Sequence, residues 1–393
     1  MRNRMNHLSL IICIFTVSLT ADQLLACPFC GPAAPSLSEQ IAAFDVVVLG
    51  KFSGGEKADR SREFAGITQF EIVEIVKGED SLLEKGDRVE LDRYRHSEAG
   101  ALVLLMANQV DKRPKWKLFI DMTPASFEYL ANAPGQEVPT TQRLSYYIKF
   151  LEHDDQTIAS DAFSEFAIAP YDDIVPLAPL MDRKKIRSWL ANPKDPADRF
   201  VRLGLYGLMM GLCGQPEDAE FLKSIVVNNS NDYQFGIDGM TSGYLLLAGE
   251  NGFDVLENEV LSSPTASYTD VFPTLQALRF MWTYSKDESA KPHLRRAMRS
   301  LLSKPQIADL VILDLARWKD WESMDKIVSH YGKADYDVPS IKRAIFRYLL
   351  VAERVPSVEG EPDQNVVKAK KYLSVLKTKD PKTAKEAQRY FFE

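Results

Sequence analysis

The spacing of the apolar residues changes near residue 140, and this change constrains the fold more than any other feature of the chain. Before it, Val, Ile and Leu gather in short runs such as 67–76 and 101–106, which end at Gly or at charged residues. After it, apolar residues recur three and four positions apart, as in 144–151. The short runs are typical of strands, and the later spacing is typical of helices that bury one face. The sequence therefore predicts a two-domain chain, β first and then α.

The β region is predicted to contain five strands after one short helix. The helix covers 37–43, and the strands are 45–51, 67–76, 88–91, 101–106 and 115–120. Gly-rich or charged turns, such as the Lys-Gly-Asp turn at 85–87, separate them. Five strands and a single helix suit a small β-barrel, and we place this domain at 27–135.

The α region is predicted to consist of helix pairs. Its helices are expected at 144–151, 158–166, 174–180, 184–190, 201–212, 219–227, 240–248, 255–261, 274–284, 294–302, 307–317, 324–331, 341–352 and 366–376. The unit from Asp198 to Val227 contains a helix, a turn and a second helix in order, and it resembles a degenerate HEAT repeat. This resemblance implies an α-solenoid over 140–356, whose long surface contacts another macromolecule.

The N-terminus of the chain has the organisation of a secretory signal peptide. Arg2 and Arg4 come first, an apolar run covers 8–19, and small and polar residues complete the segment 1–26. The twelve residues of this run are too few to cross a bilayer core of about 30 Å. We therefore expect an exported protein of the bacterial periplasm or cell envelope, whose mature chain begins at or near Cys27.

Three cysteines remain once the signal peptide is removed: Cys27, Cys30 and Cys213. In an oxidising compartment Cys27 and Cys30 can form a disulfide, which leaves Cys213 as a buried apolar residue. The Leu-Leu-Ala-Cys sequence at 24–27 also resembles the lipobox of bacterial lipoproteins. That resemblance implies a lipid on Cys27, which would leave Cys30 to pair with Cys213. Disulfide and lipid anchor stay open as alternatives for Cys27 and Cys30.

A further succession of motifs runs through the β region. Cys27-x-x-Cys30 is followed by a polar helix, by the strand 44–51 ending in Gly-Lys, and by the strand 70–78 closing on Val-Lys-Gly. Over 27–122 this succession is similar to the netrin-like domain of the tissue inhibitors of metalloproteinases. The resemblance implies an OB-fold barrel. It also implies an alternative function, an envelope protease inhibitor or regulator that acts through the barrel near the mature N-terminus.

Two departures from that family weaken the inhibitor alternative. The inhibitors begin Cys-x-Cys and chelate the protease zinc with the amino group and carbonyl of the first residue, whereas this chain has Cys27-x-x-Cys30. Disulfides tie both of those cysteines into the inhibitor barrel, but this chain has no cysteine at 31–212. Without such ties a wedge that binds a protease is poorly held.

No catalytic or metal-binding motif stands out. His96, His153, His293 and His330 are scattered, and neither Gly-x-Ser-x-Gly nor His-Glu-x-x-His occurs. We interpret each of these His residues as a surface or capping residue. The Cys-x-x-Cys pair has no thioredoxin-like context, no following His and no second ligand pair, so a thiol–disulfide or metal-binding accessory role is an alternative only. The sequence predicts no enzyme activity, no metal site and no cofactor.

Charged segments have simple structural explanations beside functional ones. The segment 92–96 is either an anion-binding site or a solvated loop. The aspartate pairs 154–155 and 172–173 are expected to cap helices. The segment 368–389, with eight Lys or Arg against two acids, either meets an acidic partner or lipid headgroups, or is a solvated helix face. A net charge of −7 argues against nucleic-acid binding, which needs clustered Lys and Arg.

These patterns together predict an exported, non-enzymatic adaptor of the bacterial cell envelope that binds a protein partner. Membrane contact is expected only through a lipid on Cys27. Trp282 and Trp318 are interpreted as core residues of helices, and 357–393 as a linker with basic C-terminal helices. The identity of the partner, the oligomeric state and the role of Cys213 stay open.

Overall fold

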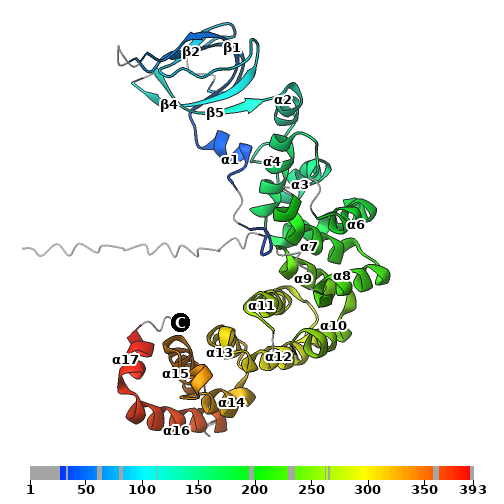
Figure 1. Cartoon of the computed structure of the whole chain (residues 1–393), viewed down its shortest axis with the longest axis vertical. Coiled ribbons are helices and arrows are strands. Elements are labelled where there is room, and N and C mark those ends of the chain that lie inside the picture. Colours follow the sequence, from blue (N-terminus) through cyan, green and yellow to red (C-terminus); the bar gives the residue numbers. More distant parts are fainter. Residues whose placement is uncertain are drawn as a thin grey trace, which may run out of the picture.

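The structure is a computed structural model that describes residues 27–31, 34–59, 64–78, 83–111, 113–193, 199–228, 235–261, 263, 266–356 and 363–389. The predicted signal peptide, 1–26, lies outside these residues. An antiparallel sheet comes first along the chain, and a region made of helices follows it (Figure 1). The order β then α, predicted from the sequence, is confirmed.

Five strands form one antiparallel sheet in the order β3-β2-β1-β4-β5. They are β1 (Val46–Glu56), β2 (Ile67–Lys77), β3 (Arg88–Leu91), β4 (Leu102–Val110) and β5 (Arg113–Met122). All five predicted strands are present; β1 and β4 run several residues past their predicted ends, and β5 is longer by two residues at each end. Within the described residues β3 and β5 each pair with one neighbour only, so the sheet is open and these two strands are its edges.

The central strand, β1, is irregular. Its register with β2 shifts at three places, and such bulges bend a strand and increase the twist of a sheet. Gly50 lies at one of these shifts, where a Cβ atom would stand 2.9 Å from Leu105 Cδ1. Glycine therefore allows β1 to pass close to the side chains of β4.

Apolar side chains cover both faces of the sheet, because alternate residues of a strand point to opposite faces. One face carries a buried cluster made by Val46, Val48, Phe70, Ile72, Val89, Val103, Leu105 and Ala107. The other face carries Val47, Leu49, Leu104, Met106 and Met122, against which side chains of the flanking helices pack. The helices that cover this second face are α1 (Leu37–Ala42) and α2 (Pro124–Ala131).

The helices of the second region match the predicted positions closely. They are α3 (Thr140–Tyr147), α4 (Gln156–Ala167), α5 (Tyr171–Ile174), α6 (Arg183–Ala191), α7 (Leu203–Cys213), α8 (Pro216–Asn228), α9 (Ile237–Ala248), α10 (Glu250–Val255), α11 (Tyr268–Tyr284), α12 (Ala290–Ser300), α13 (Ala308–Arg317), α14 (Met324–Ser329), α15 (Pro339–Glu353), α16 (Gln364–Lys379) and α17 (Pro381–Arg389). Short 3-10 segments and one π-helical segment, Leu256–Leu261, extend several of them. The helix α2 was not predicted.

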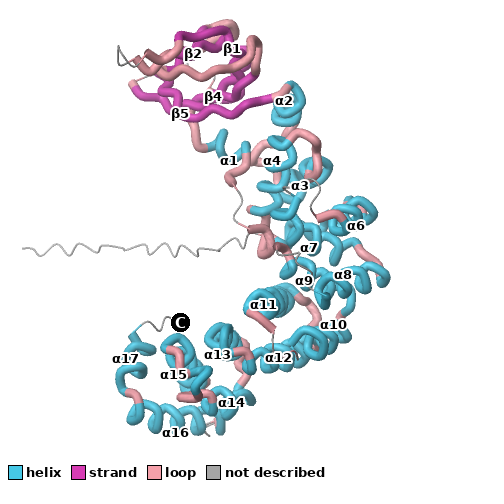
Figure 2. Tube along the Cα trace, in the orientation of Figure 1, coloured by secondary structure: helices cyan, strands magenta, loops and turns pink. Residues whose placement is uncertain are grey.

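From α7 onward the helices alternate between two layers of a curved array. The odd-numbered helices pack on one another, α7 on α9, α9 on α11, α13 on α15 and α15 on α17. Figures 1 and 2 show α11, α13 and α15 on the inner side of the curve and α10, α12, α14 and α16 on the outer side. One buried core runs through the whole helical region.

The packing of α7 on α9 depends on glycine. A Cβ atom on Gly243 of α9 would lie 2.0 Å from the carbonyl oxygen of Gly207 on α7. The two helix backbones therefore touch directly, which only residues without a side chain permit.

Candidate functional site

The predicted Cys27–Cys30 pair lies inside the molecule, as a disulfide loop packed against helices. The two residues form a disulfide with their Cα atoms 5.4 Å apart. Cys27 is 4% exposed, and its backbone N–H donates to the carbonyl oxygen of Ala167 at 3.1 Å. Between them Phe29 is buried, with its ring edge-on to the ring of Phe280 on α11 at 5.0 Å. The loop thus belongs to the core of the helical region.

This position determines what the two cysteines can do chemically. A disulfide carries no thiolate, so the pair as it stands is neither a nucleophile nor a metal ligand. A lipid on Cys27 and the disulfide require the same Sγ atom and exclude each other. The arrangement favours a structural role, in which the disulfide closes a loop that anchors the N-terminal segment.

A second anchor of that segment is a buried polar network between α1 and α4. The backbone N–H of Leu37 donates to Asp161 Oδ1 at 2.5 Å, and the hydroxyl of Tyr129 donates to Asp161 Oδ2 at 2.6 Å. One turn further along α4, Glu165 accepts from Arg143 of α3 in a buried ion pair. The network joins α1, α2, α3 and α4, and so it connects the sheet to the helices.

The environment of Asp161 raises its pKa. Burial is the largest cause, and it outweighs the hydrogen bonds from Tyr129 and Leu37, so the pKa rises from 3.8 to about 6. Burial also raises the pKa of the Tyr129 hydroxyl, which therefore remains a donor. The network joins four elements through buried hydrogen bonds and one ion pair, which is the arrangement of a structural joint.

The best candidate for a binding site is a groove of about 530 Å³ between α11 and α13. It is lined by Arg279, Trp282, Thr283, Leu310, Leu313, Asp314, Arg317 and Trp318. All of these residues belong to α11 and α13 or follow α13 directly, and none comes from the outer helix α12. The two helices that line the groove lie on the inner side of the curve (Figure 1).

Two stacked tryptophans form one end of the groove. The rings of Trp282 and Trp318 lie 4.2 Å apart and nearly parallel, at 8°. From α12, the guanidinium of Arg295 stands 5.1 Å from the centre of the Trp282 ring and donates to the carbonyl oxygen of Trp318 at 3.0 Å. Cations over the face of an indole are attracted to its π electrons, so these contacts hold the aromatic pair in place.

A buried carboxylate and two arginines form the polar part of the groove. Asp314, 3% exposed, receives Arg279 Nε at 2.6 Å and Arg317 Nη1 at 2.7 Å. The side chain of Arg317 is 68% exposed, so most of its donors face the open side. The groove thus combines Trp and Arg side chains, the residue types that dominate binding at protein interfaces, with the apolar surface of two leucines.

The sequence interpretation placed both tryptophans in the core and missed the groove. Trp318 is indeed buried, but Trp282 is half-buried and lines the open surface. A signal was present in the sequence. Arg279 and Trp282 stand three positions apart, as do Asp314 and Arg317, and residues at that spacing share one face of a helix.

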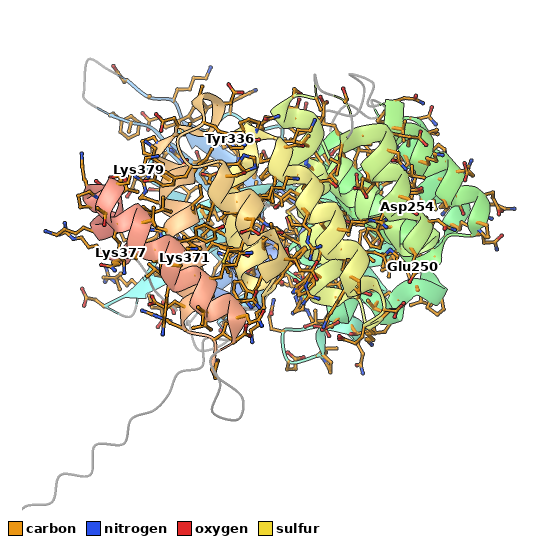
Figure 3. The ribbon with its side chains drawn as sticks, turned by 90° about the horizontal axis from the view of Figure 1, so that it is seen from below. Glu250, Asp254, Tyr336, Lys371, Lys377 and Lys379 are labelled. Carbon is orange, nitrogen blue, oxygen red and sulfur yellow. A yellow bond between two sulfur atoms is a disulfide. The ribbon has the colours of Figure 1, made fainter. Side chains whose placement is uncertain are left out.

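Most other predicted features have the expected structural roles. Asp155 is the N-cap of α4 and accepts from the N–H of Thr157 at 2.9 Å, and the pair 172–173 lies in the first turn of α5. The basic segment forms α16 and α17. Figure 3 shows Lys371, Lys377 and Lys379 on α16, on the opposite side of the view from the acidic Glu250 and Asp254 of α10.

His330 is more buried, and Cys213 less buried, than the sequence suggested. His330 is a capping residue and not a surface one: it is the C-cap of α14, is 7% exposed and is stacked 4.0 Å from the Tyr336 ring. Burial lowers its pKa, so it is neutral near pH 7. Cys213 is free and half-buried, and burial raises the pKa of its thiol to about 11. Such a thiol is protonated and unreactive at neutral pH.

Among the described residues, no group of three or more His, Cys, Asp or Glu side chains is placed to hold a metal ion. No helix in this part of the chain has both the length and the apolar character needed to cross a membrane. In comparisons with known proteins, no family model, no curated protein and no solved structure matches the chain.

Proposed function

We propose that the protein is an exported, non-enzymatic adaptor of the bacterial cell envelope, which binds a partner protein in the groove between α11 and α13. The groove carries the proposal, because it gathers Trp282, Arg279 and Arg317 between two inner helices of the array. Truncation of Trp and Arg side chains in such pockets is what costs an interface most of its affinity.

The partner is expected to insert an apolar side chain with a carboxylate nearby. The apolar group would lie against Trp282 and the leucines 310 and 313, which line the groove. The carboxylate would bond to Arg317, whose guanidinium has donors left after its bond to Asp314. An arginine that is already held by a buried carboxylate has less freedom to lose when it binds.

The architecture we propose for this adaptor is an OB-like barrel followed by a HEAT-like α-solenoid. The twisted five-stranded sheet with a buried inner face supports the first part. The two alternating layers of helices support the second, because stacked helix pairs of this kind leave one long concave face. Export to an oxidising compartment is supported by the Cys27–Cys30 disulfide.

The alternatives receive less support from the geometry. A protease inhibitor that acts through its first residue needs that residue exposed, whereas Cys27 is buried and its N–H is bonded to Ala167. A redox or metal role for Cys27 and Cys30 needs an accessible thiolate. The adaptor is the function we favour.

Site-specific photocrosslinking in the native envelope tests the proposal. A photoreactive residue at Thr283, which is exposed at the groove, is expected to give one discrete adduct with a partner protein. Arg317→Glu should abolish this adduct, because it reverses the charge that receives the partner while leaving a mostly exposed position.

A photoreactive residue at Lys370, exposed on the outer helix α16, is the control and should give no adduct of that mass. Lys370→Glu makes the same change of charge as Arg317→Glu and should leave the Thr283 adduct intact. Absence of any adduct from Thr283, or an adduct that Arg317→Glu does not reduce, would contradict the proposed binding site.

A further inference from the structure

The two edges of the open sheet border a second cavity. A cleft of about 510 Å³ is lined by residues of β3, of β5 and of the loop after β3, and by Val110 at the end of β4. The strands β3 and β5 lie at opposite ends of the sheet order, so the sheet curls until its two edges face each other across the cleft. Neither edge has a strand partner on the cleft side within the described residues, and unpaired backbone groups of an edge can accept another strand.

The longer edge, β5, offers most of this free backbone. It has ten residues, whereas β3 has four. Pro114 lacks an N–H group, so an added strand would pair with the part of β5 that follows it. Strand addition of this kind takes its affinity from backbone hydrogen bonds and its selectivity from the side chains around the edge.

The side chains around the cleft select for negative charge. Four cations line it, Arg93, Arg113, Lys115 and Lys117, against two acids, Glu90 and Asp92. This excess stands out in a chain whose net charge is −7. Lysines on an edge strand also oppose pairing between two copies of the same edge, because like charges would meet. The cleft thus disfavours self-association and favours an acidic strand.

Arginine and aromatic side chains close the inner side of the cleft. The guanidinium groups of Arg93 and Arg95 lie 5.2 and 4.6 Å from the centre of the Phe119 ring. Arg95 is also paired with Asp121, yet its Nη1 atom is buried without an acceptor in the described structure. Of the segment 92–96, read from the sequence as an anion site or a solvated loop, Asp92 and Arg93 line this cleft.

From these observations we infer that the cleft binds an acidic peptide segment of a partner protein, in extended conformation, as an added strand on β5. The free edge of β5 requires that the bound peptide be extended. The four cations favour a peptide that is acidic. The inference concerns a different surface from the groove between α11 and α13 and does not depend on the function proposed for that groove.

Fluorescence polarisation with the mature full chain tests the inference. The probe is a fluorescein-labelled peptide of alternating Glu and Val, long enough to span the free part of β5. It is expected to bind, and to bind more weakly as salt increases. The double variant Lys115→Glu/Lys117→Glu should weaken binding by about tenfold or more, because it replaces attraction with repulsion at the edge.

Three controls decide between strand addition and other outcomes. A matched peptide of alternating Lys and Val should not bind, and Lys370→Glu/Lys371→Glu, on the exposed face of α16, should leave the affinity unchanged. An acidic peptide with N-methyl groups on its pairing edge should bind about tenfold more weakly or not at all, since it cannot donate to β5. Equal binding of the N-methylated or the basic peptide, or an unchanged affinity in the Lys115→Glu/Lys117→Glu variant, would overturn the inference.

Discussion

The sheet and the helical region expose binding surfaces that are built in different ways. The cleft at the sheet is bordered by the backbone edges of β3 and β5, with charged side chains around them. The groove in the helical region is bordered only by side chains, because helix backbones satisfy their own hydrogen bonds. A strand edge accepts many sequences of suitable charge, whereas a groove of tryptophan and arginine demands particular side chains.

The two regions also differ in how closely their backbones approach. In the helical region, Gly207 and Gly243 bring two helix backbones into direct contact, and nothing there can move aside. In the sheet, Gly50 faces the end of the Leu105 side chain, which can change its rotamer. The helical region should therefore tolerate a small added volume less well than the sheet, and the joint between them should be sensitive to charge.

Gly243→Ala is expected to have the largest effect. Its Cβ atom would lie 2.0 Å from the carbonyl oxygen of Gly207, so α7 and α9 would have to separate. We expect a loss of about 5 kcal/mol in the free energy of unfolding, at the severe end for single substitutions. Urea denaturation followed by circular dichroism of the helices measures this loss.

Gly50→Ala is the matched change in the sheet. We expect it to cost about 1 kcal/mol, since its nearest contact is the flexible end of Leu105. Equal losses for the two variants would refute the difference that we draw between the regions.

Arg143→Ala should be the next most damaging change, because it acts on the joint between the regions. It leaves Glu165, whose side chain is 2% exposed, without its cationic partner. A buried charge that loses its partner costs about 4 kcal/mol. Urea denaturation of the variant at neutral pH measures the effect.

The double variant Arg143→Met/Glu165→Leu serves as the control for that prediction. It removes both charges and fills the space with apolar atoms, so most of the lost stability should return. A double variant that is no more stable than Arg143→Ala would show that the ion pair is not what makes the joint sensitive.

Asp161 should have a smaller effect than Gly243→Ala and Arg143→Ala, and this effect is a dependence of stability on pH. Its pKa is about 6 in the folded protein against an ordinary 3.8, so the folded state holds this proton more tightly than the unfolded chain. The stability that this tighter proton binding contributes is therefore fully present below pH 3.8. It is lost as the pH rises through 6. A shift of this size corresponds to about 3 kcal/mol.

Comparison with Asp161→Asn isolates this contribution, since the variant cannot titrate. The free energy of unfolding of the wild type, minus that of the variant, should decrease between about pH 4 and about pH 7. A difference that stays constant over this interval would mean that Asp161 has no raised pKa in the folded protein.

Local sequence patterns predicted much of the fold. Short runs of apolar residues predicted all five strands. Apolar residues at helical spacing predicted nearly every helix from α3 to α16. The helix α2 was not predicted; it follows β5 directly and packs two side chains, Phe127 and Leu130, on one face of the sheet. The sequence predicted that Cys27 and Cys30 could form a disulfide, but not that their loop would be buried beside Phe280.

Periodicity, capping residues and charge are local properties of a chain. For this reason the sequence by itself determined the order β then α, helix starts such as Asp155, and the position of the basic C-terminal helices. The groove and the cleft were decided only by the tertiary structure. Trp282 and Trp318 are 36 positions apart by their numbers, and Arg93 and Phe119 are 26 apart. Each pair meets because packing brings separate helices or sheet edges together, and that depends on contacts distributed along the whole chain.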